Sequence, residues 1–166
     1  MSKIIILEGP DGCGKTSLAK AINLLQPSVI CHEGPPPAEV DIIGYYETKL
    51  RGYAVSDKQS IILDRFHLGQ YVYGPMARND FRFRREHLFY FSELIEELDA
   101  ECYLVLPPYG VALDNYRVKI KQKDDYLRDF NAWHESYYRF MGLAFLHPTF
   151  DYTTDTPEEL LRGDIK

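Results

Sequence analysis

Short apolar runs alternate with longer amphipathic segments along the chain, and this alternation predicts its secondary structure. The runs that predict buried strands are residues 3–8, 28–31, 60–64, 102–106 and 150–153. Apolar residues recur at about one-turn spacing over residues 16–25, 38–55, 83–98 and 124–143, which predicts helices there. A last helix is predicted from Thr156, because Pro157 and the two acids after it are typical of a first helical turn.

Two segments carry a weaker pattern. Residues 65–82 are polar and aromatic, and no helix or strand is predicted there. Residues 111–119 are interpreted as a helix or a turn. Strands that alternate with helices throughout predict an α/β fold, a three-layer α/β/α arrangement around a five-stranded parallel sheet. The chain shows no internal repeat or linker, so we expect one domain over residues 1–166, with ligands at the carboxyl ends of the strands.

The amino-acid composition limits the cellular compartments and partners that we expect for this protein. The 166 residues are 45% apolar, but no signal-peptide core and no membrane-length apolar run is present. Three widely spaced cysteines suggest neither a zinc site nor a disulfide framework, which fits a reducing cytosol. The net charge of −6 argues against a protein whose main task is to wrap nucleic acid. We therefore expect a cytoplasmic protein with no membrane partner, and nucleic acid as a disfavoured partner.

The eight residues from Gly9 to Thr16 carry the strongest chemical signal. They fit the pattern G-x-x-x-x-G-K-[ST], with a predicted strand before them and a predicted helix after them. Such a loop cradles a polyphosphate with its backbone N–H groups, next to a helix N-terminus. The residues expected to bind ATP here are Gly9, Asp11, Gly12, Cys13, Gly14, Lys15, Thr16 and Ser17. The fold is accordingly expected to be of the P-loop NTPase type.

Individual loop residues have separable expected roles. Lys15 would reach the β- and γ-phosphates, and the hydroxyl of Thr16 would ligate Mg²⁺. Cys13 could have a lowered pKa in this position and be oxidisable, although a small loop residue is the simpler interpretation. The loop predicts nucleoside triphosphate binding.

A second chemical signal stands at the end of the third strand. Asp64 occupies the position at which P-loop enzymes keep an acid for Mg²⁺, although a solvated strand-end acid would look the same. Arg65 points to the opposite face and could clamp an anion with its guanidinium group. Asp64 and Arg65 are therefore candidate catalytic residues.

These motifs resemble the thymidylate kinase family of nucleoside monophosphate kinases. The residues that carry the resemblance are Glu8 to Thr16, Asp64-Arg65-Phe66, and the stretch from Thr154 to Glu159. The resemblance implies that Asp11 approaches the sugar 3′-hydroxyl of the acceptor, that Arg65 holds the acceptor phosphate, and that Asp64 helps to position Mg²⁺. It also places Thr154 and Asp155 near the adenine of ATP.

The sequence departs from the family on the acceptor side. The family's R-E-P-G motif appears as His32-Glu33-Gly34-Pro35, so Glu33 is retained while His32 replaces the arginine that normally touches the acceptor phosphate. The loop has Gly12 where one subgroup carries an arginine, which implies catalytic cations from a lid, assigned to residues 109–126. Within the basic run 116–123 we favour Arg117, with Lys121 and Lys123 behind it, over a merely solvated helix face.

The family's usual motif for binding the acceptor base is missing as well. The family's F-x-x-x-R pair is absent, and Tyr45 and Tyr46 stand in the corresponding stretch, while Tyr73 matches an aromatic residue after Asp64-Arg65. Each tyrosine is a candidate substrate contact or a buried core residue. The arginines within 78–85 either serve the acceptor or face water.

These observations leave three candidate functions. The first is ATP- and Mg²⁺-dependent phosphorylation of a deoxynucleoside monophosphate, most simply dTMP or a related or modified nucleotide, by a compact kinase that resembles viral ones. The second is a kinase with a hydroxyl acceptor, either a deoxynucleoside or a nucleic acid, in which Glu33 acts as the base. The third is a nucleotide-binding regulator without turnover. The resemblance also implies a homodimer through apolar helix faces such as 83–98, in a host cytoplasm if the chain is viral.

Overall fold

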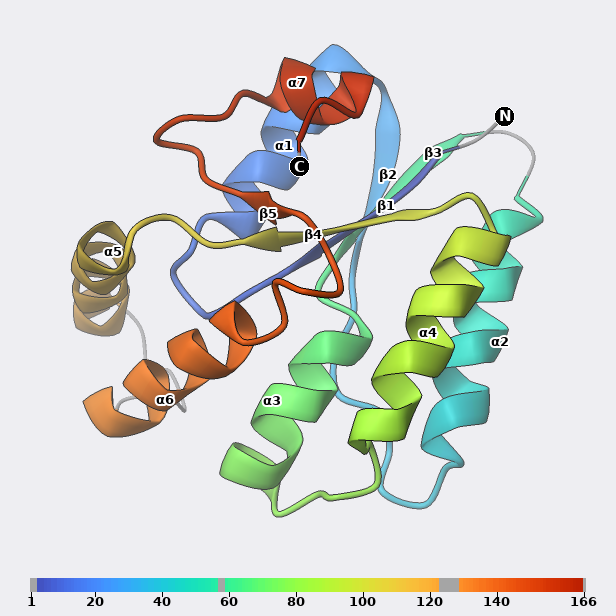
Figure 1. The fold of residues 1–166 in the computed structure, drawn as a ribbon, viewed down its shortest axis with the longest axis horizontal. Coiled ribbons are helices and arrows are strands. Elements are labelled where there is room, and N and C mark those ends of the chain that lie inside the picture. Colours follow the sequence, from blue (N-terminus) through green and yellow to red (C-terminus); the bar gives the residue numbers. More distant parts are fainter. Residues whose placement is uncertain (1–2, 57–58, 123–128, 166) are drawn as a thin grey trace.

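The computed structural model describes residues 3–56, 59–122 and 129–165. Its strands are β1 (Ile4–Glu8), β2 (Ser28–His32), β3 (Ser60–Asp64), β4 (Glu101–Val105) and β5 (Thr149–Phe150). Its helices are α1 (Lys15–Leu25), α2 (Ile42–Ala54), α3 (His67–Arg78), α4 (Arg85–Glu97), α5 (Tyr109–Gln122), α6 (Phe130–Met141) and α7 (Pro157–Arg162). The strands form one parallel sheet in the order β2-β3-β1-β4-β5 (Figure 1). The predicted α/β fold is confirmed.

Both faces of the sheet are covered because the central strand is apolar on both sides. Ile4 and Ile6 of β1 pack in the larger core, with helices α2, α3, α4 and α6. Ile5 and Leu7 point the other way and pack against α1 and α7. Figure 1 shows α1 and α7 on one side of the sheet, and α2, α3 and α4 on the other.

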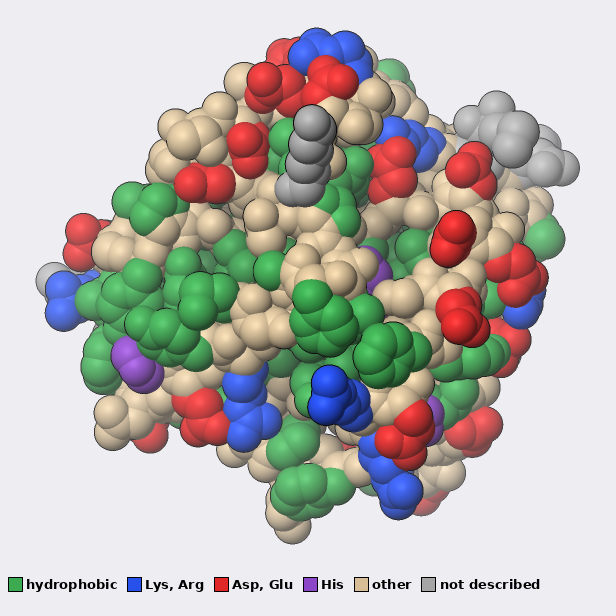
Figure 2. Space-filling model, viewed as in Figure 1, with side chains coloured by type: hydrophobic (Ala, Val, Ile, Leu, Met, Phe, Trp, Pro, Cys, Tyr) green, Lys and Arg blue, Asp and Glu red, His purple; other side chains and the backbone are tan. Residues whose placement is uncertain are grey.

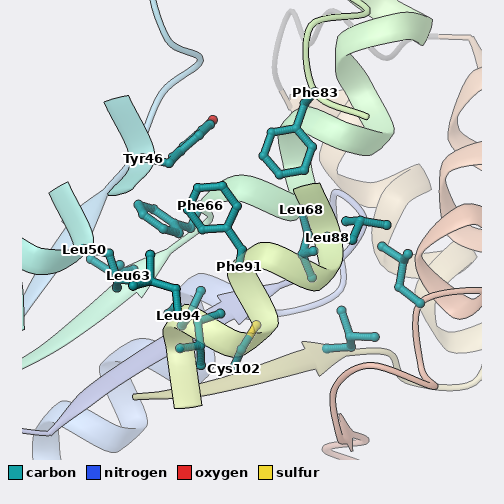
Figure 3. Packing of buried hydrophobic residues seen from close by; sticks show 14 of the residues in the cluster. Tyr46, Leu50, Leu63, Phe66, Leu68, Phe83, Leu88, Phe91, Leu94 and Cys102 are labelled. Carbon is teal, nitrogen blue, oxygen red and sulfur yellow. The ribbon is translucent and has the colours of Figure 1, made fainter. Parts of the chain in front are cut away.

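Aromatic rings fill much of the larger core. Tyr46 of α2 meets Phe66 and Phe91 edge to face, with ring centroids 4.9 and 6.1 Å apart, and Phe83 stacks on Phe91 (Figure 3). A smaller aromatic cluster between α5 and α6 contains Tyr116 and Trp133, whose rings stack at 4.8 Å. This second cluster touches the loop after β1 and so ties α5 and α6 to the loop.

The main departure from the sequence expectation is α3, which lies within residues 65–82, where no helix or strand was predicted. Its start is held by Glu8, whose Oε1 accepts hydrogen bonds from the backbone N–H groups of Phe66 and Leu68 at 2.9 and 2.8 Å. Because this capping partner comes from another strand, no local signal marks the helix. Pro75 near its end obscures the pattern further.

Other boundaries differ by several residues. Helix α4 begins at Arg85 rather than at residue 83, and α6 begins at Phe130, while residues 124–128 of the expected helix lie outside the described part of the chain. The stretch 111–119, left open between helix and turn, belongs to the continuous helix α5.

The apolar face of α4, which we expected at a dimer contact, is used within the chain. Leu88, Phe91 and Leu94 are buried in its own core, and the outer face carries exposed acids such as Glu93 and Glu97. Figure 2 shows red acidic side chains along this side of the molecule. The homodimer stays a prediction. None of the described helices is long and apolar enough to span a membrane.

Candidate nucleotide-binding site

The loop after β1 leads directly into the N-terminus of α1. Gly9, Gly12 and Gly14 all have positive φ, at 146°, 81° and 86°. A side chain at Gly9 would place its Cβ 2.6 Å from the carbonyl oxygen of Val105, so only glycine lets the loop pass this close to β4. The loop is therefore wound tightly around the start of the helix, as a phosphate cradle requires.

Lys15 crosses the inside of this loop. Its side chain is buried, with a residue exposure of 5%, and its Nζ donates to the carbonyl oxygens of Gly9 and Pro10 at 2.8 and 2.7 Å. Burial, followed by the nearby guanidinium of Arg65, lowers the pKa of Lys15. A polyphosphate in the loop would offer this ammonium group anionic oxygens in place of neutral carbonyls.

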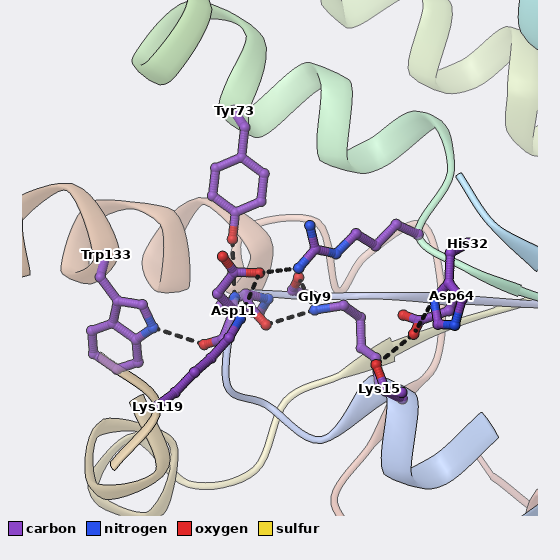
Figure 4. Close-up of polar contacts among 11 residues, drawn as sticks. Gly9, Asp11, Lys15, His32, Asp64, Tyr73, Lys119 and Trp133 are labelled. Carbon is purple, nitrogen blue, oxygen red and sulfur yellow. Dashed lines mark hydrogen bonds and ion pairs between the residues drawn. The ribbon is translucent and has the colours of Figure 1, made fainter. Parts of the chain in front are cut away.

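Thr16 and Asp64 form the candidate magnesium site. The Thr16 hydroxyl donates to Asp64 Oδ2 at 2.5 Å, and the other oxygen, Oδ1, is buried without a hydrogen-bond partner among the described residues. A free carboxylate oxygen beside a hydroxyl fits a hard cation such as Mg²⁺. His32 reaches the same acid, with its Nδ1 3.0 Å from Asp64 Oδ2 (Figure 4). The structure thus groups three of the predicted residues.

Asp11 is the centre of a cationic cluster on the other side of the loop. It is 1% exposed, forms an ion pair with Arg65 through Oδ1, and has the Nζ of Lys119 3.8 Å from the same oxygen. Figure 4 shows Lys119 approaching Asp11 from α5. Arg65 itself has a φ of 77°, a conformation that costs a non-glycine residue energy. Such strain is tolerated where the surrounding contacts fix the side chain in place.

The backbone of Asp11 is held from two helices. Its N–H donates to the hydroxyl of Tyr73 on α3 at 3.1 Å, and its carbonyl oxygen accepts from Trp133 Nε1 on α6 at 2.9 Å (Figure 4). Tyr73, a predicted substrate contact, thus also positions the loop. Trp133 was not among the predicted residues, because nothing in its local sequence shows that α6 packs on the loop.

In α5, the cation that the structure places beside Asp11 is Lys119, not Arg117. Arg117 pairs with Asp114 on its own helix at 3.6 Å, and its side chain is 59% exposed. Lys119, two positions on, faces Asp11. Helical phase was the available signal, because Lys119 shares a face with the buried Ala112 and Tyr116. Arg117 as a catalytic residue stays a prediction, and Lys123 and the side chain of Lys121 lie outside the described part.

A small cavity of about 60 Å³ opens beside Arg65 and Tyr73. The predicted residues that line it are Glu33, Tyr46, Arg65 and Tyr73, and Gln70 and Arg78 of α3 complete the wall. Glu33 has both oxygens engaged, Oε2 with Lys49 Nζ and Oε1 with the hydroxyl of Tyr53. Tyr45 lies away from this wall, with its ring centroid 5.0 Å from Lys49 Nζ.

A larger cavity of about 480 Å³ lies on the opposite side of the loop. Its lining includes Gly14, Ser17 and Asp155, which were predicted to bind ATP, together with Asn115 and Tyr152, which were not predicted. Tyr152 leans on the loop and accepts a hydrogen bond from Asn115 Nδ2 at 2.6 Å, so α5 and the turn after β5 meet here. Thr154 is used within that turn, with its Oγ1 3.3 Å from the carbonyl oxygen of Asp151.

Cys13 is not the reactive thiol that its position in the loop suggested as an option. The side chain is fully buried, and burial raises the pKa of its thiol to about 12. A thiol with so high a pKa supplies little thiolate near neutrality. Cys13 is a small residue that packs in the α5–α6 aromatic cluster.

Comparison with known proteins adds structural relatives. No protein-family profile and no curated protein matches the sequence. The YorR protein of Bacillus subtilis, solved in complex with phosphorylated GDP, superposes with a TM-score of 0.65 over 97% of this chain and 92% of its own, at 21% identity. Deoxyadenosine kinase of M. mycoides, solved with dCMP and dCDP and with dATP, gives a TM-score of 0.55 at 14% identity, over 97% of this chain and 97–98% of its own. The chain has the fold of P-loop nucleotide kinases.

In this P-loop kinase fold, two cavities flank one cationic loop at the carboxyl ends of the strands. Lys15, Arg65 and Lys119 converge on the loop from α1, the end of β3 and α5. Converging cations beside a hydroxyl–carboxylate pair are suited to holding phosphates on both sides of a transferred group.

Proposed function

We propose that the protein transfers the γ-phosphoryl group of ATP to the phosphate of a deoxynucleoside monophosphate, which yields the diphosphate. The observation that carries this proposal is the cluster of Arg65 and Lys119 on Asp11 of the loop, in which Arg65 also lines the small cavity. Two cations at this place suit an acceptor that is itself an anion. The structural relatives with bound nucleotides support a nucleotide substrate.

The residues divide the work between donor and acceptor. Lys15 neutralises charge on the donor's phosphates, and the N-terminus of α1 adds its partial positive charge. Arg65 holds the acceptor phosphate, and Lys119 of α5 stands beside it to stabilise the charge that develops during transfer. Thr16 and Asp64 would hold Mg²⁺, which, when bound, neutralises and orients the transferring phosphates.

A phosphate acceptor is favoured over a hydroxyl acceptor by the state of Glu33. A hydroxyl must lose a proton to a base in the transition state, whereas a phosphate oxygen is already ionised at neutral pH. Glu33 is the acid placed for that task, but Lys49 and Tyr53 occupy both of its oxygens. Glu33 therefore serves better as a structural anchor of the β2–α2 connection than as a base.

One observation favours the second candidate, a deoxynucleoside kinase. Glu33 lines the same small cavity as Arg65, and the structural relatives include deoxyadenosine kinases. Glu33→Gln separates the two functions. A hydroxyl-acceptor kinase should lose most of its kcat, whereas a monophosphate kinase should keep kcat within a few-fold and change mainly in KM for the acceptor.

The direct test is a phosphoryl-transfer screen with ATP and Mg²⁺ over nucleosides, nucleoside monophosphates and oligonucleotides. We expect turnover with at least one deoxynucleoside monophosphate, dTMP being the simplest. Turnover confined to nucleosides or to nucleic-acid hydroxyls would establish the second candidate. ATP hydrolysis that ignores every acceptor would instead indicate a regulator. We also expect the enzyme to act in a cytosol, the host's if the chain is viral, as a homodimer.

A further inference from the structure

An open hollow of about 580 Å³ lies next to the small acceptor cavity. Arg78, at the end of α3, lines both spaces. The β2–α2 connection forms a wall of each, with Gly34 and Pro35 at the inner cavity and Pro36 and Ala38 at the outer hollow. Figure 1 shows this connection and the α3–α4 connection approaching each other below the sheet. The two spaces are therefore neighbours, with Arg78 between them.

The rim of the outer hollow is held firmly. The guanidinium of Arg82 donates to Asp80 from Nε and Nη2, at 2.9 and 2.7 Å. Its Nη1 donates to the carbonyl oxygens of Pro37, Ala38 and Val40 at 2.8–3.1 Å. Arg82 thus ties the α3–α4 connection to the β2–α2 connection and neutralises the acid of the hollow. The shape of the hollow is set before any ligand arrives.

Two side chains in the hollow point outward from this rim. Phe81 is 63% exposed, so its ring is available to a ligand in the hollow. The Arg84 side chain is 70% exposed, and the nearest acid that contacts it, Glu86, is 3.9 Å away. An exposed aromatic ring beside an exposed guanidinium offers an apolar surface and a positive charge at one place.

Between the cavity and the hollow lies a hydrogen-bond donor, Arg78 Nε, that has no partner among the described residues. Arg78 Nη2 donates to Gln70 Oε1 at 2.6 Å, and Gln70 Nε2 donates to Asp80 at 2.8 Å. Arg78 Nε is buried and has no hydrogen-bond partner among the described residues. A buried donor without a partner costs energy, so a ligand oxygen at this point would be favoured.

We propose that the acceptor of this enzyme is a nucleoside monophosphate whose base carries an extended polar or anionic substituent. The substituent passes Arg78, lies against Phe81 and places its oxygens near Arg84. This inference rests on the proposed function, since it assumes that the acceptor phosphate binds at Arg65 and the base near Gln70. It goes further by assigning a substituent-binding site that the chain builds outside the base pocket.

The test compares matched acceptors in the full-length enzyme with ATP and Mg²⁺. One series is dUMP with hydrogen, methyl, hydroxymethyl or carboxyvinyl at C5, and the other is 7-deaza-dGMP and 7-deaza-dAMP with the same groups at C7. We expect kcat/KM to rise along at least one series, with the carboxyvinyl compound at least as good as its parent. If, in both series, the carboxyvinyl form is a worse acceptor than a parent that is used, the inference is overturned and the proposed function stays intact.

Variants locate the effect. Phe81→Ala and Arg84→Ala should each lower the ratio of kcat/KM for the carboxyvinyl compound to kcat/KM for its parent by about 10-fold. Phe89→Ala and Arg85→Ala remove exposed side chains outside the hollow and should leave that ratio unchanged. An unchanged ratio in both hollow variants would overturn the inference. So would a 5′-phosphorylated dinucleotide that exceeds every mononucleotide, because the hollow would then take a second nucleotide. If no monophosphate of any kind is used, the proposed function itself fails.

Discussion

The donor and acceptor sides of the loop are built from different kinds of contact. On the donor side the backbone dominates, through the positive φ angles of Gly9 and Gly14 and the packing of Tyr152 against the loop. On the acceptor side buried charged side chains dominate, with Asp11 paired to Arg65 and Glu8 capping α3. One half is a shaped backbone, and the other is a network of long-range side-chain contacts.

This difference determines how each half can change. The phosphate cradle of the donor half is built from consecutive residues, so nearly any change within it disturbs the cradle itself. The acceptor half joins residues that are 54 to 62 positions apart, as in the contacts of Asp11 with Arg65 and Tyr73. In the sequence, His32 and the absent F-x-x-x-R motif are departures from the resembled family, whereas the loop keeps its pattern. If the proposed roles hold, a substitution in the acceptor half should change the use of the acceptor and leave the donor cradle intact.

The largest expected effect comes from breaking the donor half at Lys15. Lys15→Met removes the ammonium group inside the loop and should lower kcat about 10³-fold with the best acceptor, because the donor phosphates lose their principal protein cation. Steady-state kinetics measure this. Lys20→Met, at an exposed position of the same helix, is the matched control and should change kcat less than two-fold. Equal losses in both variants would contradict the assignment.

Substitution of Arg65 should impair the acceptor half and leave the donor half intact. Arg65→Ala should reduce kcat/KM for the acceptor about 10²-fold, because the acceptor phosphate loses its guanidinium partner, and should leave KM for ATP within three-fold. Varying each substrate at saturating levels of the other separates the two constants. Arg85→Ala, at the exposed start of α4, serves as the control. A KM for ATP that rises as much as the acceptor constant would show that the two halves are not separable at this residue.

The acceptor half should also respond to pH through Glu8. Burial raises the pKa of this carboxyl from its ordinary 4.5 to about 7, so the folded chain holds the proton more tightly than the unfolded chain does. Stability that Glu8 contributes below about pH 4.5 is therefore lost as the pH rises toward 7, by about 3 kcal/mol. We expect urea unfolding to show that, between pH 4.5 and 7, the free energy of unfolding of Glu8→Gln rises by that amount relative to the wild type.

A matched control keeps this prediction specific. Glu96→Gln changes an exposed acid on α4 and should run parallel to the wild type at every pH. If Glu8→Gln also runs parallel to the wild type between pH 4.5 and 7, the carboxyl of Glu8 is not protonated in the folded chain. The acceptor half would then owe its pH response to other groups.

The same contrast explains what the sequence could predict. The strands and the loop were predictable because their signals are consecutive residues, whether an apolar run or a glycine pattern. The start of α3 was not, because its cap is Glu8, 58 residues before Phe66 in the chain. Lys119 was within reach of a stricter use of helical phase. The hollow beside Arg78 could not be predicted, because it exists only where two separate connections meet.

The smallest expected effect tests whether the donor half extends to α7. Thr156 caps this helix by accepting from Glu159 N–H at 3.3 Å, and it also lines the donor cavity. Thr156→Ala should cost about 1 kcal/mol of unfolding free energy, because the first turn of α7 loses its cap. We expect KM for ATP to rise two- to three-fold while KM for the acceptor is unchanged. Thr156→Ser keeps the hydroxyl and should restore both values, whereas a shift in the acceptor constant alone would place α7 with the other half of the site.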